Sequence, residues 1–205
     1  MSTSRKWSST PIMFSNSNGV MKPLAMEKTL DLTLEELCFG CVKRIPLTRA
    51  VVIENGQLVE EEETLTIKVK PGWRKGTKIT FEGKGNETSP ATYTQDVNIV
   101  IGEKPHHLFS REGDNLELTI EVPLVDALTG CTIPVPLLGG EKMSLAVNHV
   151  MQPSYERVIE GQGMPKSEEG DRGNLHVKFL VTFPTKLTNE QRACVCSILQ
   201  EPSES

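Results

Sequence analysis

After residue 27, most of the chain consists of short runs in which apolar and polar residues alternate. The first run is Leu30, Asp31 and Leu32, and comparable runs recur at 45–47, 65–69, 97–101, 116–120 and 175–179. Turn sequences such as Asn55-Gly56 and Pro71-Gly72 separate the runs. A period of two between turn signals predicts β-strands, and we expect these strands to pair antiparallel. Short helical turns are predicted at 34–39 and 125–128, so the expected fold class is all-β.

An internal repeat relates two parts of this β pattern. A shift of 78 residues superposes the sequence EGKG at 82–85 on EGQG at 160–163, together with the apolar residues that flank them. Upstream the shift is 90 residues, and about 12 additional residues of the first copy fall in an acidic hairpin around 54–63. We therefore predict two tandem, related β-sandwich domains, over 27–110 and 111–186, preceded by a disordered leader over 1–26.

The C-terminal residues 187–205 have a different pattern, typical of a helix. Thr188 and Gln191 have the spacing of a capping box, and Val195, Ile198 and Leu199 then recur at helical intervals. A single amphipathic helix with one apolar stripe either docks on its own domain or covers a partner subunit. We predict that it holds a homodimer together.

Composition and charge exclude several classes of protein. Among 205 residues, 22 Lys and Arg face 27 Asp and Glu, and a net charge of −5 argues against a general nucleic-acid binder. No apolar run reaches the roughly 18 residues that would span a membrane. The five cysteines have no regular spacing and no signal peptide precedes them, which predicts a reducing, cytosolic location. The polar leader favours disorder over an organelle transit peptide.

The sequence offers little catalytic or metal-binding chemistry. Cys38 and Cys41 have the spacing of a zinc or redox pair, but no second ligand pair lies at a matching distance. Cys41 also has a repeat counterpart in Cys131, which favours a small, partly buried residue after a turn. His106 and His107 are interpreted as loop residues, and no nucleophile stands in an identifiable catalytic motif. We expect neither enzymatic activity nor a cofactor nor a metal, and a metal or redox activity at Cys38 and Cys41 is kept as a minor alternative.

The first β domain carries apolar residues whose neighbours along the strand are polar. They are Leu30, Ile45, Leu47 and Ile99, and Lys43, Arg44 and Lys104 would flank them with positive charge. Two interpretations are open. The apolar residues either line a groove for an extended peptide with acidic groups, or simply form the core of the domain.

The same residues resemble a known family. The segments LDLTLEELCFGCVKRIPLTR (30–49) and LTIKVKPGWRKGTKITFEGKGNE (65–87) are similar to the first C-terminal β domain of J-domain proteins, the heat-shock protein 40 co-chaperones. The segment GQGMPKSEEGDRGNLHVKFLVTFPTKLTNEQ (161–191) resembles the end of their second domain and the start of their dimerisation helix. No four-fold Cys-x-x-Cys-x-Gly-x-Gly module lies between Leu47 and Leu65, so the resemblance is to class B.

This resemblance implies specific roles. Leu30, Ile45, Leu47 and Ile99 match positions that line a pocket for unfolded client polypeptides. Lys43 and Lys104 match basic positions that hold the acidic C-terminal tail of the heat-shock protein 70 partner. The chain departs from the family at three positions: Pro46 and Ala50 replace common lysines, and Lys28 replaces an apolar pocket residue.

The hypothesis is therefore a non-enzymatic co-chaperone module that binds unfolded protein, docks the partner's tail and dimerises. The 205 residues contain no His-Pro-Asp tripeptide, so we expect no stimulation of the partner's ATPase by the family mechanism. The alternative is a structural or assembly protein that uses the same fold as a scaffold.

Overall fold

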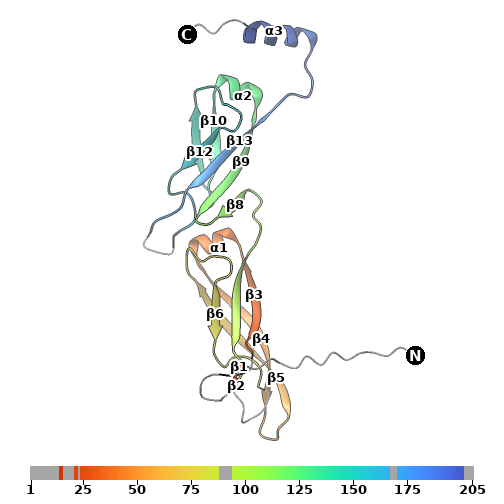
Figure 1. The fold of residues 1–205 in the computed structure, drawn as a ribbon, viewed down its shortest axis with the longest axis vertical. Helices are drawn as coiled ribbons and strands as arrows, with labels where there is room; N and C mark the ends of the chain where they lie inside the picture. Colours follow the sequence, from red (N-terminus) through yellow and green to blue (C-terminus); the bar gives the residue numbers. More distant parts are fainter. Residues whose placement is uncertain (1–13, 16–20, 23, 88–93, 167–169, 201–205) are drawn as a thin grey trace, which may run out of the picture. The chain divides into compact units, whose positions relative to one another are not determined.

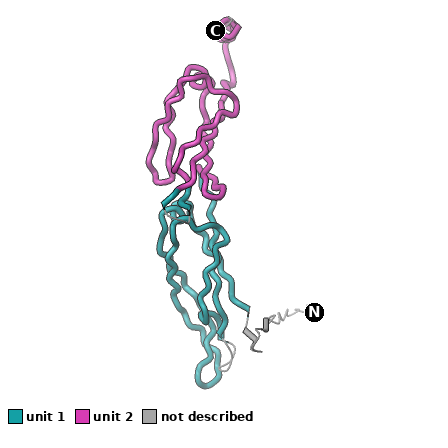
Figure 2. The backbone as a smooth tube through the Cα atoms, turned by 60° about the vertical axis from the view of Figure 1, so that its left-hand side comes forward, with its two compact units in different colours: residues 1–107, 164–171 teal, residues 108–163, 172–205 magenta. Residues whose placement is uncertain are grey.

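The computed structural model describes residues 14–15, 21–22, 24–87, 94–166 and 170–200. Most of the leader predicted over 1–26 lies outside these residues, apart from a short pairing of β1 (Phe14–Ser15) with β2 (Met21–Lys22). The chain divides into two compact units, residues 1–107 with 164–171 and residues 108–163 with 172–205 (Figure 2).

Apart from the β1–β2 pair, the described part of unit 1 consists of two sheets and one short helix (Figure 1). The first sheet has the order β3 (Met26–Leu32), β7 (Val97–Glu103), β6 (Lys78–Phe81). The second is a hairpin of β4 (Cys41–Val52) and β5 (Leu58–Val69). Between β3 and β4 lies α1 (Leu34–Phe39), where Thr33 caps the N-terminus and Gly40, at φ +76°, ends the helix.

The core of unit 1 follows from the alternation along its strands. Buried residues alternate with more exposed ones over 45–47 of β4, 65–69 of β5 and 97–101 of β7, and the apolar side chains of the two sheets share one interior. The buried apolar residues of these strands and of α1 are Leu32, Ile45, Leu47, Leu65, Ile67, Val69, Val97, Ile99 and Ile101, with Leu34, Leu37 and Cys38 of α1.

Unit 2 repeats this arrangement. Its larger sheet has the order β12 (Glu156–Ile159), β13 (Leu175–Thr182), β9 (Asn115–Pro123), β8 (Phe109–Glu112), and β10 (Cys131–Pro136) pairs with β11 (Lys142–Val147). Helix α2 (Leu124–Thr129) lies between β9 and β10, as α1 lies between β3 and β4. The all-β fold class is confirmed, and the structure repeats in the order that the sequence predicted.

The inserted residues of the first copy lengthen its hairpin. Both β4 and β5 have 12 residues, whereas β10 and β11 have 6 each. The additional residues lie in the acidic segment around 54–63, where the shift between the two copies changes from 90 to 78 residues.

One expectation about strand pairing is wrong. β3 pairs parallel to β7, and β9 pairs parallel to β13. Alternation of apolar and polar residues reports which face is buried but carries no information about strand direction. In each unit, the connection through a helix, a hairpin and one further strand returns the chain in the same direction beside its starting strand.

The C-terminal helix α3 (Asn189–Gln200) begins where its capping box predicts. The Gln191 backbone N–H donates to Thr188 Oγ1 at 3.2 Å, and the Thr188 N–H donates to Gln191 Oε1 at 2.9 Å. None of the helices in the described part of the chain has the length and apolarity needed to cross a membrane.

Candidate functional site

The structure brings the predicted client-pocket residues together, mostly inside the core of unit 1. Ile45 is 8% exposed, Leu47 is 3% exposed and Ile99 is fully buried, whereas Leu30 on the edge strand β3 is partly exposed. Burial therefore favours the core interpretation for the first three residues. Their contact with a client stays a prediction, because a peptide would first contact the exposed residues of the unit.

One exposed feature near these residues is the outer edge of β4, the side of the strand that does not pair with β5. The Ala50 and Val52 backbone N–H groups donate away from β5, to Asn86 Oδ1 at 2.9 Å and Glu87 Oε2 at 3.1 Å. Backbone groups alternate in direction along a strand, so the even-numbered residues of β4 direct theirs to this edge. Within the described ranges, no hydrogen bond occupies the edge-facing backbone groups of Val42, Arg44 and Thr48.

Side chains on the outward face of β4 are compatible with an exposed edge. Val42 is 60% exposed, and Arg44, Pro46 and Thr48 are also exposed. Pro46 directs its nitrogen away from β5, so its missing N–H costs no hydrogen bond of the hairpin. The Lys28 Nζ of β3 donates to the Pro46 carbonyl at 2.9 Å, across the gap between the two sheets of unit 1.

Lys43, predicted to receive an acidic tail, is already paired. Its Nζ donates to Glu36 Oε1, while Glu36 Oε2 accepts from the Thr33 backbone N–H at 3.1 Å as part of the α1 capping box. Burial raises the pKa of Glu36, but the hydrogen bonds from Lys43 and Thr33 and the charges of Lys43 and Lys104 more than offset this and lower it. The charges of Lys43 and Lys104 thus act on one carboxylate, and their binding of an acidic tail stays a prediction.

The neighbouring acid of α1 anchors a different segment. Glu35 Oε1 lies 3.1 Å from His106 Nε2, and the His106 side chain is 10% exposed. Burial raises the pKa of Glu35, but hydrogen bonds with its own backbone and with Thr33, and the interaction with His106, lower it overall. His106 is therefore a loop residue, as predicted, and it holds the chain after β7 against the start of α1.

The cysteines offer no metal cluster within the described ranges. None of the five, all of which lie among those residues, is in a disulfide. Burial and the negative charge of Glu36 raise the pKa of the Cys41 thiol. A thiol held protonated is a poor nucleophile and metal ligand, which disfavours the redox alternative.

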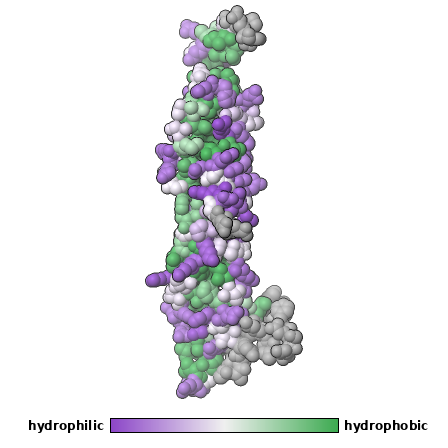
Figure 3. Space-filling model, turned by 90° about the vertical axis from the view of Figure 1, so that its left-hand side faces the viewer, coloured by the Kyte–Doolittle hydropathy of each residue, from purple (hydrophilic) through white to green (hydrophobic). Residues whose placement is uncertain are grey.

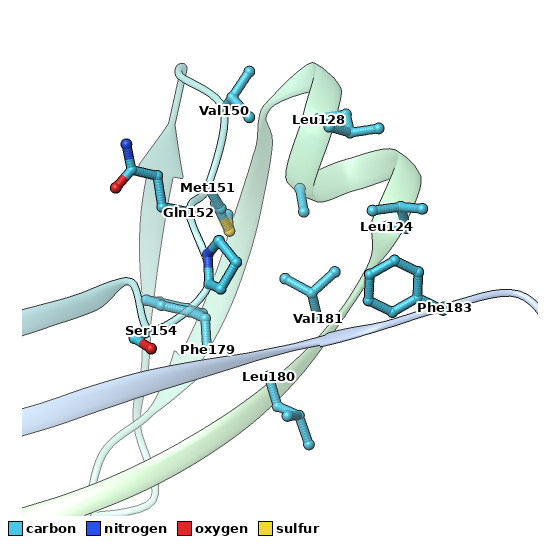
Figure 4. Close-up of a pocket in the computed structure, with 12 residues that line it drawn as sticks. Leu124, Leu128, Val150, Met151, Gln152, Ser154, Phe179, Leu180, Val181 and Phe183 are labelled. Carbon is cyan, nitrogen blue, oxygen red and sulfur yellow. The ribbon is translucent and has the colours of Figure 1, made fainter. Parts of the chain in front are cut away.

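Exposed apolar residues occur in both units, for example Val42 and Leu58 in unit 1 and Val125 and Phe183 in unit 2. On the face in Figure 3, hydrophilic residues separate the hydrophobic areas. Unit 2 has an apolar cavity of about 440 Å³ between α2, the 150–154 loop and β13 (Figure 4). Its lining includes Leu124, Leu128, Met151, Phe179 and Phe183.

The predicted dimerisation residues are accessible in the single chain. Val195, Ile198 and Leu199 are 44%, 71% and 65% exposed. Val195 and Leu199 line a second cavity together with Leu124, Leu128 and Phe183, whereas Ile198 is absent from that lining. The stripe therefore has one part directed at its own unit and one part exposed.

The structure thus has two β units of related architecture, and the first has an accessible strand edge with Lys28, Lys43 and Arg44 on or beside it. Comparison with known proteins gives the family. The DnaJ C-terminal domain family matches residues 26–184, and the chain belongs to it, which confirms the predicted resemblance.

Relatives from distant organisms agree. The chain is 39% identical over 166 residues to Protein psi1 of Schizosaccharomyces pombe, covering 80% of this chain and 44% of that protein. It is 40% identical over 169 residues to human DnaJ homolog subfamily B member 13, covering 82% and 53%, and 30% identical over 171 residues to Protein SIS1 of Saccharomyces cerevisiae, covering 83% and 47%. The chain thus spans about half the length of these curated relatives.

Two interactions of the site were missed from sequence. Glu36 was not paired with Lys43, although the spacing of Thr33 and Glu36 is that of a capping box and would have placed the carboxylate at the start of α1. The hydrogen bond from Lys28 to Pro46 was also missed. No local signal could have revealed it, because it joins two strands that belong to different sheets.

Proposed function

We propose that unit 1 binds unfolded polypeptide by adding an extended segment to the outer edge of β4, with Lys43 and Lys104 receiving carboxylates of an acidic chain end. The observation that supports this most directly is the set of unoccupied backbone groups at Val42, Arg44 and Thr48 next to those lysines. Strand addition uses main-chain hydrogen bonds, which every polypeptide can supply, and therefore suits a protein that meets many clients.

Under this proposal, the chain is a binding module of a co-chaperone and not an enzyme. Its acidic ligand would be the C-terminal tail of a heat-shock protein 70 partner, which brings several carboxylates to Lys43 and Lys104. The 205 residues contain no His-Pro-Asp tripeptide, so we propose that they do not themselves stimulate the partner's ATPase. Two of the cysteines are exposed and none is in a disulfide, which supports a reducing, cytosolic location.

The tail-binding part is tested by calorimetry with an acidic C-terminal peptide. Lys43→Ala combined with Lys104→Ala should weaken binding about tenfold or more, since contacts to charged groups contribute roughly 1.5–3 kcal/mol when partly desolvated and less when exposed. Lys68→Ala with Lys70→Ala removes the same charge from exposed positions at the end of β5 and should change affinity little. Equal affinity for the parent and the first variant would remove these lysines from the site.

We further propose a homodimer held by α3. The structure leaves none of the residues of α3 buried, although Val195, Ile198 and Leu199 form an apolar stripe. A second copy would cover this stripe, and the adjoining apolar cavities beside α2 provide a continuous surface for it.

A scaffold or assembly protein is the second candidate. One observation favours it: two groups of the proposed site, the Pro46 carbonyl and Lys43, already have partners within the chain. Suppression of the aggregation of a denatured client separates the candidates. A co-chaperone module should suppress it at near-stoichiometric amounts, whereas a scaffold should have no effect.

A further inference from the structure

The side chain of Lys28, a residue of β3, reaches the middle of the outer edge of β4. This side chain is exposed and reaches from β3 to the Pro46 carbonyl, with 2.9 Å between Nζ and the oxygen. Pro46 has no backbone N–H to donate, and the Lys28 ammonium on its carbonyl occupies the place that the N–H of an added strand would take. The accessible edge is thereby divided into Val42–Arg44 on one side and Thr48 on the other.

An added strand hydrogen-bonds to every second residue of the strand it joins. A peptide that lies along β4 from Val42 to Thr48 would meet four edge-facing residues, and Pro46 is the third. While Lys28 holds the Pro46 carbonyl, the peptide has contact with only short lengths of edge. Continuous pairing requires Lys28 to leave.

The partner of Lys28 is unusual for a lysine in this chain. Within the described ranges, Lys28 has no carboxylate within ion-pair distance, whereas several other lysines each pair with a glutamate: Lys43, Lys78, Lys84 and Lys178. An ammonium on a neutral carbonyl would gain from exchange to a carboxylate, because the hydrogen bond would then join two opposite charges.

Building on the proposed function, we propose that Lys28 is a selectivity gate on the β4 edge. A bound segment must carry a carboxylate near Pro46 that draws the Lys28 ammonium away, and this exchange releases the carbonyl for strand pairing. Extended peptides with an acidic residue at this register therefore bind, and neutral ones of the same shape are disfavoured.

The test is a double-mutant cycle between the peptide and Lys28. One extended peptide carries a single Glu at the register of Pro46, its partner carries Gln there, and binding of each to the full chain is measured by calorimetry. Lys28→Met keeps the length of the side chain but removes the ammonium. Lys78→Met is the matched control, because Lys78 is an exposed lysine of the same sheet, on β6.

We expect the parent to prefer the Glu peptide by about tenfold. Lys28→Met should bind the Gln peptide at least about threefold more tightly than the parent and lose most of the preference, while Lys78→Met should behave like the parent. If the parent binds both peptides and Lys28→Met leaves both affinities unchanged, the gate is refuted and strand addition survives. If no variant binds either peptide, strand addition to β4 is refuted and the gate with it.

Discussion

Replacing Ile45 by Ala distinguishes a core residue from a pocket residue. Ile45 lies on β4 opposite Leu65 of β5, with 8% of its surface exposed, so truncation leaves a cavity between the two sheets. Replacement of a buried isoleucine by alanine costs about 2–5 kcal/mol of unfolding free energy. Val42→Ala on the same strand is the control, because Val42 is 60% exposed on the opposite face and its truncation should cost less than ~0.5 kcal/mol.

The assay is urea unfolding followed by tryptophan fluorescence. The chain has two tryptophans, Trp7 and Trp73, and Trp73 belongs to unit 1. A Trp7→Phe background therefore leaves a signal for unit 1 alone, which matters because two units need not unfold in one transition. If Ile45→Ala destabilised unit 1 no more than Val42→Ala but weakened client binding, Ile45 would belong to an accessible pocket and the core assignment would be refuted.

Three further outcomes are expected. Glu36→Gln keeps an acceptor for the α1 cap but removes the negative charge that opposes Lys43. Calorimetry should therefore show that the variant binds an acidic peptide about two- to fivefold more tightly than the parent, whereas the control Glu35→Gln should bind it as the parent does. Equal affinities of the parent and Glu36→Gln would contradict this prediction. Cutting the chain after Pro184 should give a monomer in analytical ultracentrifugation, and a truncated dimer would exclude α3 as the interface. Gly173→Ala should lower the melting temperature of unit 2 sharply, because the added Cβ would clash with the Asp114 backbone oxygen; an unchanged melting curve would refute that close packing.

The fold was largely predictable because its determinants are local. Alternation along the strands, the glycine turns and the two capping boxes each depend on residues close in sequence, and the repeat supplied the domain plan. Strand direction was not predictable, since β3 and β7 are joined through a helix and three strands and their pairing depends on the whole topology.

The site was less predictable for the same reason. Sequence identified Lys43 as a cation beside apolar strands, but it could not show that α1 places Glu36 against it. Nor does alternation reveal whether a buried face is sealed, because that depends on the opposite sheet, which here leaves Ile99 with no exposed surface. The hydrogen bond between Lys28 and Pro46 depends on the approach of two sheets.

The long hairpin of unit 1 has a mechanical consequence. Strands of 12 residues extend for roughly 40 Å, yet the buried residues of β5 are confined to its second half, from Leu65 onward. The distal half is a two-stranded ribbon, which has little stability of its own, and Asn86 and Glu87 fasten it at Ala50 and Val52. A force applied at the tip would therefore act on the hydrogen bonds of Asn86 and Glu87 before it acts on the core. Because the fastened residues and the proposed peptide edge lie on one strand, a load on the ribbon would be transmitted directly along β4 to the place where a client would pair.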